Sequence, residues 1–144
     1  MEQTNKSILL ITRSISLILL AVVGITALFG GAALIIDPSG QSMSLKLEGL
    51  TGTLFDDYRS PGIVLFFAIG VLSSSVAVLT AVNFKSYPIL IFYQGVMLTG
   101  WILAQLYILP GTHILQAVYC LFGIMLMLLG SYLMIKKKQL NTLY

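Results

Sequence analysis

Four long apolar stretches dominate the sequence and constrain its fold more than any other feature. About 20 residues, rising 1.5 Å each in a helix, cross the roughly 30 Å of hydrocarbon in a bilayer. The stretches do not alternate apolar with polar residues, which excludes barrel strands. We therefore predict an all-α membrane protein, with four transmembrane helices in a left-handed bundle and a single domain over residues 1–144. The predicted spans are residues 14–36, 62–82, 88–109 and 114–135.

Composition excludes a water-soluble domain. Only 9% of the residues are charged and 58% are hydrophobic, with a mean hydropathy of +0.97. A soluble domain carries about 25% charged residues, which it needs to cover its surface. In such a chain the net charge of +3 indicates how the protein is oriented in the membrane, not that it binds nucleic acid. We therefore expect membrane lipid as the partner.

Basic residues gather in alternate extramembrane segments, and this sets the orientation. Cytoplasmic segments are enriched in Lys and Arg, so both termini should be cytoplasmic. The Lys136–Lys138 run is explained by a stop-transfer anchor, with a patch for lipid headgroups or a partner as the alternative. One side has Lys6, Arg13, Lys85, Lys136, Lys137 and Lys138, and the other has Lys46 and Arg59.

The first apolar stretch also has the outline of a secretory signal, because Lys6 and Arg13 precede it. Its apolar run exceeds 20 residues, however, and a signal core is shorter. We expect this segment to be a retained helix.

The connection over residues 37–61 is the one sizeable segment outside the predicted spans. It opens with turn-forming residues, in which Asp37 should accept from backbone N–H groups and Gly40 should permit a left-handed exit. Its apolar residues alternate as in a short strand around Met43 and then recur at helical spacing towards Phe55. Both patterns indicate an amphipathic segment, which either caps the helix ends or forms a lid over a site.

Three short motifs carry a family resemblance. The chain resembles small bacterial four-span membrane proteins that have no assigned activity. The resemblance implies a four-helix bundle in the bacterial cytoplasmic (inner) membrane, and it brings no catalytic residues. The motifs are Gly30-Gly31-x-x-Leu34-x-x-Asp37-Pro38-Ser39-Gly40, Phe55-x-Asp57-Tyr58-x-x-Pro61-Gly62 and Trp101-Ile102-x-x-Gln105.

The predicted spans contain no Asp, Glu, Lys, Arg or His. Ionisable residues inside the membrane mark proton relays and ion paths, so their absence argues against a proton-coupled efflux pump. The single histidine, His113, excludes bis-histidine haem ligation, and the single cysteine, Cys120, excludes a dithiol redox pair. We expect no catalytic residues and no cofactor.

Small residues recur along each span and predict close helix packing. Where no hydrophobic effect drives helices together, such stripes let backbones approach. We interpret them as the internal seam of the bundle. Examples are Gly24 and Gly31 in the first stretch, Gly70 in the second, and Gly123 and Gly130 in the fourth.

Uncharged polar residues form the candidate site. Gln94, Trp101 and Gln105 lie on one face of the third span, and Gln116 opens the fourth. In one interpretation the glutamines bond across helices and Trp101 fills space, with Gln94 or Gln105 accepting from its indole N–H. In the other, the four residues line a cavity for a neutral amphipathic molecule such as a quinone or lipid.

Four residues near the predicted outer face are weak metal candidates, namely Asp37, Asp56, Asp57 and His113. Carboxylates and an imidazole are able to bind a divalent cation. Their spacing matches no metal motif, and we expect solvated side chains and no metal.

The sequence leaves three functions open. The first is a non-enzymatic accessory or interaction subunit that contacts other membrane subunits or itself. The second is a binding or transport protein for a neutral hydrophobic molecule. The third and most distant is a lipid-modifying enzyme that uses Asp57 and His113.

The charge bias makes a direct prediction about topology. Cysteines introduced as Ser42→Cys and Thr142→Cys should react with an impermeant thiol reagent from opposite sides of the membrane, Ser42→Cys from the outside. Labelling of both cysteines from the same side would contradict a topology with four spans and cytoplasmic termini.

Overall fold

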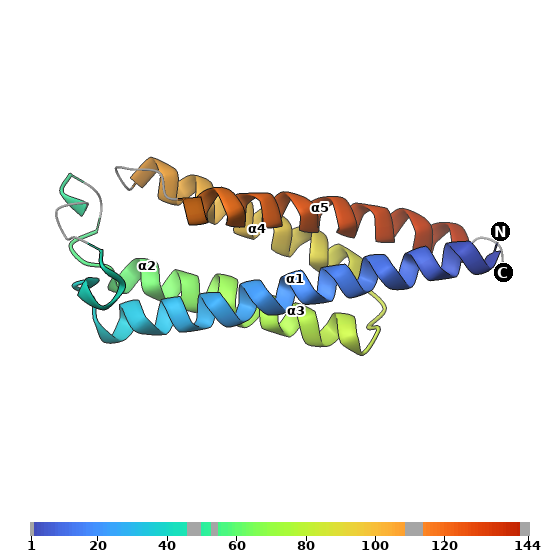
Figure 1. Cartoon of the computed structure of the whole chain (residues 1–144), viewed down its shortest axis with the longest axis horizontal. Coiled ribbons are helices and arrows are strands. Elements are labelled where there is room, and N and C mark those ends of the chain that lie inside the picture. The colour runs from blue at the N-terminus through green and yellow to red at the C-terminus, as the bar shows by residue number, and fades with distance from the viewer. Residues whose placement is uncertain (1, 46–49, 53–54, 109–113, 142–144) are drawn as a thin grey trace.

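A computed structural model describes residues 2–45, 50–52, 55–108 and 114–141. The described chain is helical and contains no strand, and it confirms the predicted all-α four-helix fold (Figure 1). The second long helix is continuous but consists of three parts, α2, η3 and α3. The elements are α1 Glu2–Ile36, η1 Gln41–Met43, α2 Arg59–Val64, η3 Leu65–Val71, α3 Leu72–Ala81, α4 Tyr87–Ile108 and α5 Ile114–Asn141.

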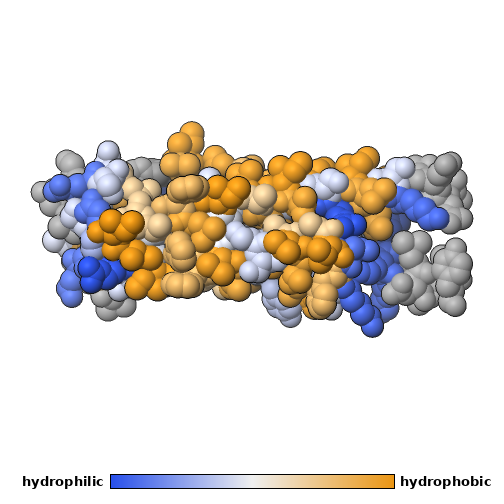
Figure 2. All heavy atoms as spheres, turned by 90° about the horizontal axis from the view of Figure 1, so that it is seen from below, coloured by the Kyte–Doolittle hydropathy of each residue, from blue (hydrophilic) through white to orange (hydrophobic). Residues whose placement is uncertain are grey.

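Four helices are long and apolar enough to cross a membrane, as the sequence predicts. Helix α1 begins twelve residues before its predicted span and α5 ends six residues after its own, because polar residues end a hydrophobic span without ending a helix. The face shown in Figure 2 has an apolar band between two hydrophilic ends. These features are those of a multi-pass membrane protein. The apolar helices are Asn5–Ile36, Arg59–Ala81, Tyr87–Tyr107 and Ile114–Gln139.

The first two long helices form a hairpin in which backbones lie in close contact. A Cβ added at Gly31 would lie 2.6 Å from the backbone nitrogen of Phe66, and one at Gly24 would lie 3.0 Å from that of Ser74. Glycine is therefore required where α1 crosses η3 and α3. The predicted seam in the first stretch is confirmed.

A π-helical stretch, η3, brings two glycines of the second helix onto one face. Gly62 and Gly70 are eight residues apart, whereas two α-helical turns take about seven. A π turn takes in an additional residue, which restores the alignment. Both glycines then meet α1, because added Cβ atoms would lie 2.7 Å from Leu34 Cβ and 2.9 Å from the backbone nitrogen of Leu28, respectively.

Helices α4 and α5 form a second hairpin with the same kind of seam. A Cβ at Gly95 would lie 2.6 Å from the backbone oxygen of Gly123, and one at Gly130 would lie 2.7 Å from the backbone nitrogen of Phe92. Neither position accepts a side chain without moving a helix backbone. The predicted seam in the fourth stretch is thus also confirmed.

The two hairpins converge at the end that holds both termini and diverge towards the 37–58 connection (Figure 1). Near the termini, Tyr87 at the start of α4 is only 2% exposed and lies beneath Arg13 of α1 and Lys137 of α5. On the other half, the Tyr119 hydroxyl of α5 donates an exposed hydrogen bond to Thr26 Oγ1 of α1 at 2.6 Å.

The connection folds over the end of the first hairpin. Asp37 accepts from the Ser39 backbone N–H at 3.2 Å and the Ser42 N–H at 2.8 Å, and Gly40 has φ +74°, as predicted. The hydrogen bond from the Ser39 hydroxyl, and after it those from the two backbone N–H groups, lower the pKa of the Asp37 carboxyl. The strand-like alternation that begins at Met43 does not form a strand there, because Gln41–Met43 is a 3₁₀ turn, and residues 46–49 of this pattern lie outside the described residues.

The apolar side chains of the connection pack onto the helix ends. Leu50 and Tyr58 are each 4% exposed and form a small core with Leu34 of α1. Leu45 and Phe55 pack against it. This arrangement agrees with the predicted cap.

Two glycines of α4 provide a matched test of the seam. Gly95→Ala should destabilise the protein by about 1–3 kcal/mol, because the new methyl group meets backbone. Gly100→Ala should be neutral or stabilise by up to about 1 kcal/mol, because nothing lies within 4 Å of its added Cβ and alanine favours helix. Thermal unfolding in detergent measures both, and equal midpoints would contradict the close crossing of α4 and α5.

Candidate ligand-binding cleft

Two adjoining cavities lie between the hairpins, on the side of the connection. The first has a volume of about 210 Å³ and reaches between the helices, and the second has about 450 Å³ and extends beneath the connection. We call the two together the interhairpin cleft. Six residues line both cavities, namely Met43, Leu65, Trp101, Gln105, Leu115 and Gln116.

Every long helix contributes to the cleft wall, and the connection completes it. Gly30 and Ile69 face the first cavity from the first hairpin, and Leu98 faces it from α4. Leu45 and Phe55 of the connection face the second cavity. The divergence of two tightly packed hairpins therefore creates the space.

The cleft is uncharged among the described residues that line it. Its wall is mostly apolar, with amide groups from Gln105 at the end of α4 and Gln116 at the start of α5. Tyr58 also borders it, and burial raises the pKa of the Tyr58 phenol above its ordinary 10.0. This phenol is neutral at neutral pH, so the wall suits a neutral molecule.

The structure brings together three of the four residues proposed as a site. Trp101, Gln105 and Gln116 line the interhairpin cleft, and Gln116 is 7% exposed. Gln94 lies outside it, 2% exposed between α4 and the second helix. The other interpretation, of a glutamine bonded across helices, describes Gln94.

Gln94 makes a buried polar contact between the hairpins. Its Nε2 donates to Ser73 Oγ at 2.8 Å and approaches the Ala68 carbonyl oxygen at 3.5 Å. Ser73 is fully buried, so the hydrogen bond satisfies two polar groups that water does not reach. This contact connects α4 to the second helix.

Trp101 has an unsatisfied indole nitrogen. Its Nε1 is buried and has no hydrogen-bond partner in the described part of the chain. The expectation that Gln94 or Gln105 accepts from it is therefore wrong, and for Gln94 the bond from Nε2 to Ser73 shows that its amide is directed at the second helix instead. A buried donor without an acceptor costs about 1–3 kcal/mol.

The sequence predicts the connection as either a cap or a lid over the site, but not which of its residues border the two cavities. Met43, Leu45 and Phe55 were interpreted only as a cap or lid, and which cavity they border depends on chain contacts distant in sequence. The feature of the sequence that points to these residues is the presence of large apolar side chains in an otherwise polar segment.

The metal candidates do not assemble among the described residues, where no group of three His, Cys, Asp or Glu side chains is close enough to hold an ion. Asp37 is engaged by Ser39 and Ser42, and Asp57 Oδ1 accepts from the Arg59 N–H at 2.9 Å. Asp56 is exposed, and His113 lies outside the described residues.

Comparison with known proteins does not assign the chain to a family. No protein-family model, curated protein or solved structure matches the chain. The resemblance to small bacterial four-span proteins stays a prediction from the sequence motifs.

Proposed function

We propose that the protein binds a neutral amphipathic molecule, such as a quinone or a lipid, in the interhairpin cleft within the bacterial cytoplasmic membrane. The observation that carries the proposal is an uncharged, mainly apolar cleft with Trp101, Gln105 and Gln116 in its wall. Sites of this kind combine apolar walls with a few polar groups, and the 450 Å³ cavity lies within their usual range of roughly 300–1,000 Å³.

The distribution of polar groups suggests how such a molecule is oriented. Gln105 and Gln116 lie near the connection-side ends of α4 and α5, so a polar headgroup is expected there. An apolar tail would then extend along Ile69 and Leu98 towards the middle of the bundle. Amides both donate and accept, and therefore suit a carbonyl or hydroxyl headgroup.

The proposed setting follows from charge. Six basic residues on the side of the termini support cytoplasmic N- and C-termini. The connection and the wide part of the cleft would then lie on the outer side of the membrane. The described residues that line the cleft include no charged group suited to catalysis, and we propose binding or transport rather than an enzyme.

An accessory or interaction subunit remains the second candidate. The sequence argument for it was the density of small-residue stripes. The structure uses those at Gly24, Gly31, Gly95, Gly123 and Gly130 inside the hairpins, which leaves them unavailable to a partner. Co-purification of a larger membrane protein would favour this candidate.

The single tryptophan makes ligand binding measurable. Titration of the detergent-purified protein with decylubiquinone, or with a phosphatidylcholine carrying brominated acyl chains, should quench Trp101 fluorescence with saturation. Gln105→Leu should lower the affinity for the ligand that shows saturation, by roughly three- to tenfold. This is the effect of losing one hydrogen bond of about 0.5–1.5 kcal/mol.

Gln94→Leu is the matched control, because it makes the same change on the same helix outside the cleft. This variant should unfold more readily, yet bind with nearly unchanged affinity. Two results would overturn the proposed function. The first is that quenching by decylubiquinone and by the brominated lipid never saturates. The second is that Gln105→Leu and Gln94→Leu lose affinity equally.

A further inference from the structure

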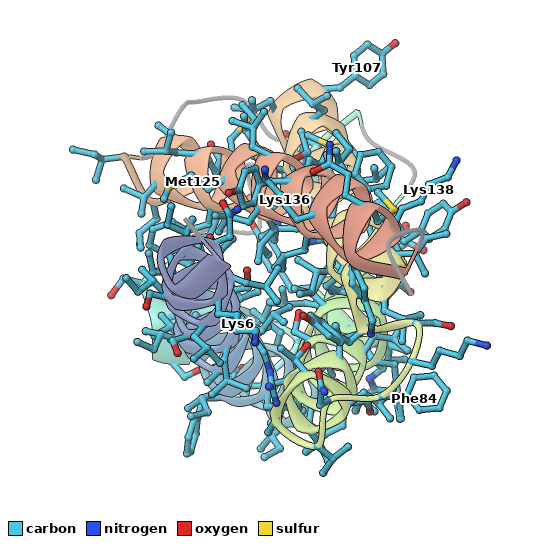
Figure 3. The ribbon with its side chains drawn as sticks, turned by 90° about the vertical axis from the view of Figure 1, so that its right-hand side faces the viewer. Lys6, Phe84, Tyr107, Met125, Lys136 and Lys138 are labelled. Carbon is cyan, nitrogen blue, oxygen red and sulfur yellow. The ribbon has the colours of Figure 1, made fainter. Side chains whose placement is uncertain are left out.

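Two cationic side chains from opposite hairpins converge on one buried ring at the end with the termini. The Arg13 guanidinium carbon lies 5.6 Å from the centre of the Tyr87 ring, and Lys137 Nζ lies 4.7 Å from it. Tyr87 is nearly inaccessible, and its ring attracts both charged groups through cation–π interactions. Figure 3 looks onto this end and labels three further lysines there, Lys6, Lys136 and Lys138.

Neutral carbonyl groups hold both cations in place. Arg13 donates from Nε to the Thr80 oxygen at 2.9 Å and from Nη2 to the Ala81 oxygen at 2.7 Å, at the end of α3. Lys137 Nζ donates to the Lys85 backbone oxygen at 2.9 Å. Arginine has five N–H donors and lysine has three, so donors of both groups are left for another acceptor.

Among the side chains that the structure describes, no carboxylate bonds to this pair, and Glu2, the acidic residue of α1, precedes Arg13 by eleven residues. Asp37, Asp56 and Asp57 belong to the connection, at the opposite end of the bundle (Figure 1). Lys85 adds a further exposed cation in the turn between α3 and α4. Two cations that both lie against one ring repel each other, and an anion that contacts both would offset this repulsion.

An apolar groove begins at the same arginine. A cavity of about 220 Å³ is bordered by Arg13, Ser14 and Ala81 together with Leu10 and Leu17 of α1. It lies between α1 and α3 and contains one charged group beside leucine side chains. This combination matches an anionic headgroup with an acyl chain attached.

We propose that Arg13 and Lys137 form a seat for the phosphate of an anionic phospholipid, with one acyl chain in the groove beside Leu10 and Leu17. The phosphate would accept from the remaining donors of both cations, and the bound lipid would bridge the two hairpins where they converge. This seat is separate from the interhairpin cleft, and the inference does not depend on the proposed function.

The proposal can be tested on the full chain purified in an uncharged detergent. Added dioleoylphosphatidylglycerol should raise the thermal unfolding midpoint more than the same amount of dioleoylphosphatidylcholine, whose choline cation is repelled by the seat. In Lys137→Gln, phosphatidylglycerol should bind about fivefold more weakly, as expected for the loss of one basic residue facing an anionic lipid.

Lys136→Gln provides the control, because it removes the same charge from the neighbouring position on α5. Its response to phosphatidylglycerol should match that of the unmodified chain. Arg13→Gln removes the other cation at the Tyr87 ring, and it should show the same weakened response if Lys137→Gln does not fold.

Three results would overturn the proposal. The first is an equal response of the unmodified chain to the two lipids. The second is an equal loss in Lys136→Gln and Lys137→Gln, which would indicate diffuse charge rather than a seat. The third is full stabilisation by inorganic phosphate alone, which would exclude a role for the acyl chain.

Discussion

Close backbone contact at glycine is the constraint on which the rest of this structure depends. In a membrane the lipid is as apolar as the helices, so burial of hydrophobic surface does not hold helices together. Gly31 brings α1 against the backbone of Phe66, and Gly95 brings α4 against that of Gly123. Each contact packs two helices along their length, which makes the two hairpins the structural units of the protein.

The contacts between the hairpins combine an apolar core, to which Leu20 of α1 and Ile91 of α4 belong, with a few polar contacts. Gln94 and Ser73 share a buried hydrogen bond, and Tyr87 packs beneath Arg13 and Lys137 at the end with the termini. Towards the connection the hairpins diverge, and the apolar space between them is bordered by all four long helices. Backbone contact within the hairpins, and an apolar core with a few polar contacts between them, thus leave a neutral cleft at one end and place two basic side chains at Tyr87 at the other.

Much of this architecture could be predicted because it is encoded locally. Span length, the glycine spacing at Gly24 and Gly123, and the turn at Asp37 follow from a few neighbouring residues. The π-helical stretch could not be predicted in this way, since it is defined by how Gly62 and Gly70 meet α1. The roles of Gln94 and Gln105 also differ only through their partners, because both are glutamines on the same inward face of α4.

The central claim is that two rigid hairpins are joined at one end and separate at the other. Spin-label distances between the second helix and α4 test it directly, using exposed positions in a Cys120→Ser background. The pair Ile63 and Tyr107 reports the connection side, and the pair Val78 and Ile89 reports the side of the termini. The account predicts a broad distribution for the first pair that narrows with decylubiquinone, and a narrow, unchanged distribution for the second. Equal widths and equal responses in both pairs would contradict it.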